Sequence, residues 1–198
     1  MCGDDHLGHG RTAAAKEDLG YFGEKDGWIH MVDDENRMRM EMQKRYPDLP
    51  YFLLGHSMGS FITRNYVTKY ADGLSGYICC GTSGPVPMSG FAILLSNIVI
   101  AFQGGRHTGY FLNKLAFQDY NSRYGEVKTG LEWLSRDQEI YAPFADDPKA
   151  NFIFTNAGFR DLFHLLNSVT GKKWSSRLPK QLPMLFLSGD MDPVGQFG

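Results

Sequence analysis

An uncharged apolar run at residues 51–54 breaks at once into Gly-His-Ser-Met-Gly at 55–59. Such a run is typical of a strand that is buried on both faces of a sheet. Beyond it, apolar side chains follow the i, i+3, i+4 spacing of a helix with one buried face, at positions 58, 61, 62, 66 and 70. The pattern predicts a strand, a sharp turn and a helix.

Helices and strands are predicted to alternate on either side of this unit. Among the charges of residues 28–46, apolar positions recur with the period of an amphipathic helix, which Pro47 ends. Two further apolar runs, 74–80 and 182–188, are typical of buried strands. Helix, strand, helix and strand in this order predict an α/β fold with a parallel sheet.

The pattern changes between Val86 and Lys180. Helix-like segments rich in Phe, Leu and Tyr replace the alternation, at 90–102, 109–118, 131–141 and 158–169. The first has no obviously polar face, so it is either fully buried or lines an apolar groove. A helical insertion between two strands of a parallel sheet is one way to cover an active site. We therefore expect three parts: a first core part at 1–85, a helical lid at 86–180 and a second core part at 181–198.

Composition and charge narrow the class of protein. The chain has 198 residues, 42% of them hydrophobic, which is enough for one domain with a substantial core. Its net charge of −2 provides no basic field, so we expect no nucleic acid partner. The longest apolar run, 91–102, is too short to span a bilayer, so we expect no stable membrane insertion.

The cysteines and the first residues indicate a compartment. Three cysteines, two of them neighbours at Cys79 and Cys80, cannot form a disulfide framework, which favours the reducing cytoplasm. Met1 leads straight into polar residues, so we expect no signal peptide. No His or Cys cluster has the spacing of a metal site, and we expect neither a metal nor a cofactor.

Ser57 is the strongest candidate for chemistry. Strand, Gly-x-Ser-x-Gly turn and helix form the setting of a nucleophile elbow. A serine on such a turn adopts an unfavourable backbone conformation, and we expect Gly55 and Gly59 to remove side chains that would collide with neighbouring backbone. The hydroxyl is then presented at the carboxyl end of the sheet, where α/β folds bind their ligands.

Two carboxylates follow the last predicted strand. Asp190 and Asp192 lie in the loop after 182–188, and a loop there shares its edge of the sheet with Ser57. In this kind of fold the catalytic acid follows the serine along the chain. Either carboxylate therefore suits the acid of a triad, and the alternative is that both only cap a turn.

Four segments together point to a family. They are Asp-His-Leu-Gly-His-Gly-Arg-Thr at 5–12, Gly-His-Ser-Met-Gly at 55–59, Trp-Leu-Ser-Arg-Asp at 133–137 and Gly-Asp-Met-Asp-Pro-Val at 189–194. With them the chain resembles, over nearly its whole length, the monoacylglycerol lipase and lysophospholipase branch of the α/β-hydrolases, also grouped with the serine aminopeptidases. The resemblance implies Ser57 as nucleophile, the Met58 backbone N–H as one oxyanion donor and Asp192, not Asp190, as the triad acid.

The chain departs from the family pattern at both ends. Family members have an earlier strand whose His-Gly end supplies the second oxyanion donor, and a catalytic histidine in a loop after the acid. This chain begins downstream of the first and stops at Gly198, six residues after Asp192, so it resembles an interior piece of such an enzyme. We expect His56 to pack beneath the elbow and His30 to be exposed. We expect no convincing base among the other histidines, which are His6 and His9 in the opening loop and His107 and His164 in the lid.

The resemblance implies a serine hydrolase of carboxylic esters that works through an acyl-serine. An apolar lid suits a small ester with one acyl chain, such as a monoacylglycerol or lysophospholipid. The alternatives are a proline iminopeptidase or thioesterase of the same superfamily, and a non-catalytic ligand-binding or interaction module on the same fold. Without its histidine, we expect the chain to hydrolyse esters poorly or not at all. We also expect an exposed sheet edge that promotes self-association.

Overall fold

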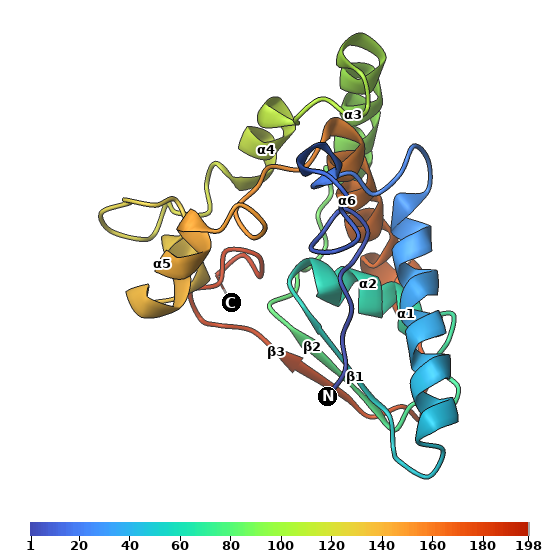
Figure 1. Ribbon diagram of the computed structural model, residues 1–198. Coiled ribbons are helices and arrows are strands. Elements are labelled where there is room, and N and C mark those ends of the chain that lie inside the picture. The colour runs from blue at the N-terminus through green and yellow to red at the C-terminus, as the bar shows by residue number, and fades with distance from the viewer. Residues whose placement is uncertain (198) are drawn as a thin grey trace.

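The structure is a computed structural model that describes residues 1–197, and its sheet has three parallel strands (Figure 1). The strands are β1 (Phe52–His56), β2 (Gly76–Cys80) and β3 (Met184–Leu187), in the order β1-β2-β3. In the register of the sheet, His56 pairs with Cys80 and Cys80 with Leu187. The carboxyl ends therefore meet at one edge, and the predicted parallel α/β fold is confirmed.

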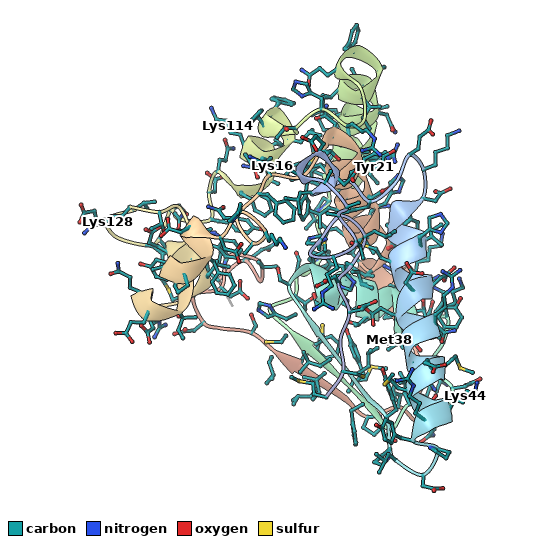
Figure 2. All side chains as sticks on the ribbon, viewed as in Figure 1. Lys16, Tyr21, Met38, Lys44, Lys114 and Lys128 are labelled. Carbon is teal, nitrogen blue, oxygen red and sulfur yellow. The ribbon has the colours of Figure 1, made fainter. Side chains whose placement is uncertain are left out.

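Three helices form the core on one side of the sheet. They are α1 (Gly27–Arg45), α2 (Met58–Val67) and α6 (Asn156–Ser168), which contact one another, and α2 packs directly on β1 and β2. Apolar side chains from these elements are fully buried, among them Ile62, Tyr66, Tyr77 and Leu165. Figure 2 shows charged side chains such as Lys44, Lys114 and Lys128 pointing away from the core.

Helices also fill the chain between β2 and β3, as the sequence predicted. In order they are α3 (Ser89–Gln103), α4 (Tyr110–Phe117), α5 (Gln138–Asp146), α6 and α7 (Gly171–Ser175). Two 3₁₀ turns, η1 (Lys16–Asp18) and η2 (Glu132–Leu134), complete the elements. The expected single helix at 131–141 is wrong, because the chain forms η2 first and begins α5 only at Gln138.

Burial of the strands on both faces was a wrong expectation for β1. Leu53 and Gly55 are buried, whereas Phe52 and Leu54 are 61% and 63% exposed. Leu185, Phe186 and Leu187 of β3 are also exposed by nearly half. The reason is that α2 packs chiefly on one face of β1 and β2, so the alternate side chains of β1 point to the open face and β3 is left with less cover.

Helix α3 buries two serines, whereas several of its large apolar residues are exposed. Ser89 and Ser96 are buried, and the Ser96 hydroxyl donates a hydrogen bond to the carbonyl of Ala92 at 2.7 Å. Phe91, Leu94, Ile98 and Phe102 are exposed. Of the two alternatives expected for this segment, full burial is wrong, and lining an apolar groove is borne out, because Phe91 and Ala92 line a mostly apolar cavity. The helix packs against α6. Within residues 1–197, no helix is both long and apolar enough to cross a bilayer.

Candidate functional site

Ser57 lies on the sharp turn that the sequence predicted, between β1 and α2. Its φ and ψ are 51° and −123°, a conformation that is strained for a residue with a side chain. Gly55 is required, because a Cβ there would lie 2.1 Å from Thr63 Oγ1 and 2.4 Å from the carbonyl oxygen of Gly59. The expected role of Gly59 is wrong, since a Cβ at that position meets open space.

Backbone contacts hold the turn in place. The Ser57 N–H donates to the carbonyl of Cys80 at 3.1 Å, which continues the β1–β2 ladder beyond the strand. The Ser57 carbonyl accepts bonds from the N–H and the hydroxyl of Ser60. Within residues 1–197, the hydrogen bonds found for Ser57 are thus made by its backbone N–H and carbonyl groups. Its side chain is partly exposed, and the residue lines a cavity.

The acid loop reaches the same hollow as Ser57. A cavity of about 420 Å³ is lined by Ser57, Asp190 and Asp192 together. Asp192 is half-buried, and its Oδ1 accepts the N–H of Val194 at 2.9 Å. Asp190 is 83% exposed at its side chain and pairs with Arg136 at 2.7 Å. Asp192 therefore lies deeper in the hollow and retains a second carboxylate oxygen for another partner, although the two acids share the cavity.

Two larger cavities also meet at Ser57. One, of about 530 Å³, is mostly apolar and is lined by Phe61, Phe91 and Leu162 among others. The other, of about 800 Å³, carries polar groups as well, including His6 and Asn113. Ser57 therefore lies where an apolar and a more polar space join, which suits a molecule with one end of each kind.

The histidines divide into two groups. His6, His9 and His56 line the cavity of about 800 Å³ with Ser57, whereas His107 and His164 line none of the three cavities around it. The expectation for His56 is wrong: it is exposed and lines the cavity with Ser57 and Asp192, because the last residue of β1 points away from α2.

His9 and His164 pack against aromatic rings, and His30 is exposed as expected. His9 Nδ1 lies 3.0 Å from the carbonyl oxygen of Leu7, and its ring stacks on Phe22, with burial lowering its pKa. His164 stacks on Trp28 with ring centroids 5.8 Å apart, so its ring is committed to packing.

Arg64 of α2 anchors the elbow and was missed by the sequence analysis. Its side chain is buried and donates hydrogen bonds to Thr82 Oγ1 at 3.1 Å and to the Ser83 carbonyl at 2.8 Å. It also donates to the Val169 carbonyl, and its guanidinium carbon lies 4.2 Å from the centre of the Trp174 ring. These contacts tie α2 to the loop after β2 and to the end of α6. The sequence offered no signal for it, because Arg64 lies outside the predicted apolar face at 58, 61, 62, 66 and 70, where a charged residue is expected to be exposed.

Glu132 organises the loop beside the polar cavity. Its Oε1 accepts the N–H groups of Lys128 and Thr129 at 2.8 and 2.7 Å, and these bonds lower its pKa to about 2. Thr129 and Gly130 line the cavity of about 800 Å³. The ionised carboxylate therefore shapes one wall of the cavity. No motif pointed to it, because its partners are two backbone N–H groups and the Thr129 hydroxyl.

A group of ionisable side chains lies at the edge of the same cavity. His6 Nδ1 is 3.4 Å from Glu35 Oε1 and 3.9 Å from Asp4 Oδ1. Burial and the nearby Asp4 carboxylate raise the pKa of Glu35 to about 8, while burial lowers the pKa of His6. The spacing argument in the sequence could not find this group, since Glu35 belongs to α1, far along the chain from His6.

Comparison with known proteins identifies relatives over the whole chain. A family model described as serine aminopeptidase, S33, matches residues 1–198. The monoglyceride lipase of Mus musculus is 29% identical over 193 residues, and that of Homo sapiens 29% over 194. Each match covers 95% of this chain and 54% of the relative, so the chain spans about half the length of these curated relatives.

Solved structures agree with the fold. A carboxyl esterase from Bacillus coagulans superimposes with a TM-score of 0.89 at 36% identity, over 98% of this chain and 63% of that one. A monoglyceride lipase variant from Saccharomyces cerevisiae superimposes with a TM-score of 0.67 at 20% identity, over 96% of this chain and 59% of that one, which shows the fold alone. The parallel sheet and its helices are therefore those of an α/β-hydrolase.

Proposed function

Because the chain belongs to the serine aminopeptidase S33 family of α/β-hydrolases, we propose that it carries the nucleophile and acid of a carboxylic ester hydrolase. The observation that supports this most is the strained turn at Ser57, which opens between an apolar and a more polar cavity. A backbone that holds a serine at φ 51° stores strain, and strain of this kind concentrates at functional sites.

The proposed reaction uses Ser57 Oγ as nucleophile. A general base removes the hydroxyl proton while the oxygen attacks the ester carbonyl, and an acyl-serine forms as the alcohol leaves. The Met58 N–H begins α2 and is free of an intrahelical acceptor, so it suits the developing oxyanion. One such donor contributes about 3 kcal/mol to the transition state. Water then releases the acid, and the reaction needs neither metal nor cofactor.

Asp192 is the proposed triad acid. Its side chain lines the cavity with Ser57, and one oxygen is already held by the Val194 N–H. A carboxylate fixed in this way can orient an imidazole and stabilise its cation. Asp190 is the less suitable of the two because it is exposed and paired with Arg136.

We propose a monoacylglycerol, lysophospholipid or similar ester as substrate. The apolar cavity of about 530 Å³ suits one acyl chain, and the polar cavity suits a hydroxylated leaving group. The monoglyceride lipases among the relatives support the same class. In this proposal the lid segment 86–180 covers the site through α3 and α4, since Phe91 and Phe117 line the apolar cavity, while α6 of the same segment packs in the core.

The described residues provide no hydrogen-bonded base for Ser57. Within residues 1–197 no side chain forms a hydrogen bond with the Ser57 hydroxyl, so none of the described histidines is held against it. We therefore expect slow ester hydrolysis by the 198-residue chain, by a factor on the order of 10⁴ or more below a complete triad.

Labelling and turnover test this proposal separately. We expect a fluorophosphonate to modify Ser57 slowly and Ser57→Ala not at all, because the turn still presents the hydroxyl. Hydrolysis of p-nitrophenyl esters of increasing acyl length measures turnover and the use of the apolar cavity. A chain whose Ser57 stays unmodified would instead be a ligand-binding module, and preference for peptide amides would favour an iminopeptidase. The free cysteines suit the reducing cytoplasm that we propose as its compartment.

A further inference from the structure

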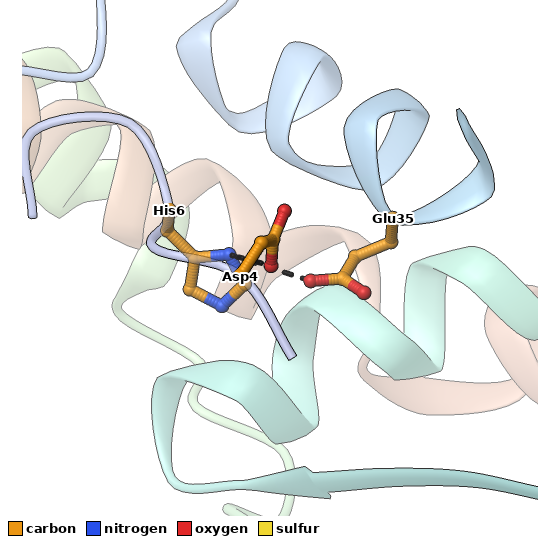
Figure 3. A group of neighbouring side chains, drawn as sticks. All are labelled: Asp4, His6 and Glu35. Carbon is orange, nitrogen blue, oxygen red and sulfur yellow. Dashed lines mark ion pairs between the residues drawn. The ribbon is translucent and has the colours of Figure 1, made fainter. Parts of the chain in front are cut away.

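The opening segment and α1 bring three metal-ligating side chains together. Asp4, His6 and Glu35 each offer one ligand atom, and these atoms lie within 4.8 Å of one another. Figure 3 shows Asp4 and His6, from the opening segment, facing Glu35 of α1. Two of the distances, 3.4 Å from His6 Nδ1 to Glu35 Oε1 and 3.9 Å from His6 Nδ1 to Asp4 Oδ1, involve the imidazole nitrogen.

These distances fit a shared cation. Nitrogen and oxygen ligands lie about 2.1 Å from Zn²⁺, so two ligands of a tetrahedral ion are roughly 3.4 Å apart. The pair formed by His6 and Glu35 has this separation, and the pair formed by His6 and Asp4 needs to close by about half an ångström. Asp4 is exposed at the surface and can make that adjustment.

The charges of the group also favour a cation. Two carboxylates face each other, and among the ion pairs of residues 1–197 both have His6 as their basic partner. Glu35 is only 12% exposed at its side chain, so water solvates its charge poorly. A divalent ion that displaces the proton of Glu35 would interact with both carboxylates at once.

The site is supported and accessible. Glu35 is carried by a helix of 19 residues, and the His6 carbonyl accepts a turn bond from the His9 N–H at 2.9 Å, so two of the three ligands have fixed backbones. His6 lines both the cavity of about 800 Å³ and a second cavity of about 590 Å³ that Asp4 also lines. Water ligands could therefore complete the coordination, and an ion could enter from solvent.

We propose that Asp4, His6 and Glu35 form a binding site for a divalent transition-metal ion, separate from the Ser57 chemistry. An imidazole with two carboxylates suits Zn²⁺ better than Mg²⁺, which prefers oxygen ligands alone. A bound ion would link the opening loop to α1 beside the polar cavity.

Calorimetric titration with ZnCl₂ alone tests the site. All proteins carry Cys2→Ser, which removes an exposed thiol that could bind the ion on its own. We expect one equivalent of Zn²⁺ to bind, Glu35→Gln to weaken binding at least about tenfold, and Glu41→Gln to leave it unchanged. Glu41 is the matched control, because it lies on the same helix but pairs with Arg45 outside the group.

A second variant keeps the test valid if Glu35→Gln disturbs folding. Asp4→Asn is at an exposed position and should weaken Zn²⁺ binding similarly without changing the circular dichroism spectrum. Zn²⁺ should also raise the unfolding temperature of the parent but not of Asp4→Asn. Equal binding by the parent, Glu35→Gln and Asp4→Asn would mean an adventitious ion only and would overturn the proposal. Mg²⁺ binding as tight as that of Zn²⁺ would overturn the assigned class of ion.

Discussion

The two faces of the sheet differ although the same strands build them. On the face covered by α2, Leu53 is 7% exposed and Tyr77 of β2 is 1% exposed. On the opposite face, Phe52 and Leu54 remain more than half exposed. Neighbouring residues of equal hydrophobicity thus differ in solvent exposure, because successive side chains of a strand point to opposite faces and a helix packs against only one face. The apolar character of a strand residue therefore allows its burial, but the elements that pack against the strand decide which of its residues are buried.

Leu53 and Leu54 provide the sharpest test of this difference. Leu53→Ala should lower the free energy of unfolding by about 3 kcal/mol, because it leaves a cavity in a packed core. Leu54→Ala should cost less than about 1 kcal/mol, since its side chain is 63% exposed. Urea denaturation of the two variants measures both values. Equal losses would mean that the open face is covered in solution.

The covered side also contains a buried carboxyl group whose ionisation should destabilise the fold. Asp161 of α6 is fully buried, and burial raises its pKa to about 6 although Arg160 lies 3.6 Å away. Its folded pKa is above its unfolded value, so the folded chain binds the proton more tightly and stability falls as pH rises through this range. The expected loss from this group is roughly 2 kcal/mol between pH 4 and pH 7.

Asp161→Asn isolates that contribution. The amide cannot ionise, so the variant should lose less stability than the parent when urea denaturation is compared at pH 4 and pH 7. Glu41→Gln on the exposed face of α1 should leave the pH dependence of the parent unchanged. Parallel curves for the parent and Asp161→Asn would contradict a raised pKa at this site.

The open face should show its effect in association rather than in folding. β1 and β3 are the outer strands of the described sheet, and β1 presents Phe52 and Leu54 beside its unpaired edge. We expect the chain to self-associate through this edge. Phe52→Lys should weaken association about tenfold, the equivalent of about 1.4 kcal/mol, with little change in unfolding.

Sedimentation equilibrium measures that association. Lys44→Glu is the control, because it changes an exposed charge at the end of α1 without touching the sheet. A parent chain that stays monomeric at high concentration, or an equal effect of both substitutions, would show that the open edge is not the contact.

Much of the candidate site was predictable because it depends on local chemistry. The strand, the turn at Ser57 and the helix after it follow from residues close together in the sequence, whereas the strained φ of 51° is held by contacts such as the bond from the Ser57 N–H to the Cys80 carbonyl. The loop of Asp190 and Asp192 was placed correctly because the ends of parallel strands share one edge. The catalytic roles of Ser57, Met58 and Asp192 stay predictions until they are measured.

Other features depend on contacts between distant segments. The exposure of His56, the outward apolar face of α3 and the buried bonds of Arg64 all depend on which element packs against which. The group of Asp4, His6 and Glu35 joins a loop to a helix that begins at Gly27, and no spacing rule connects them. At Gly59 the sequence argument predicted a steric requirement for glycine, but the packing leaves open space where a Cβ would lie.

The sequence by itself determined the order of strands and helices along the chain, their parallel arrangement and the position of the sharp turn at Ser57. These depend on the periodicity of side chains and on the backbone freedom of a few residues, which are properties of short segments. Only the tertiary structure decided which apolar residues are covered, which cavities meet at Ser57 and which charges lie together. Burial and electrostatic interaction depend on distances in space, and the chain sets those only when its segments have packed.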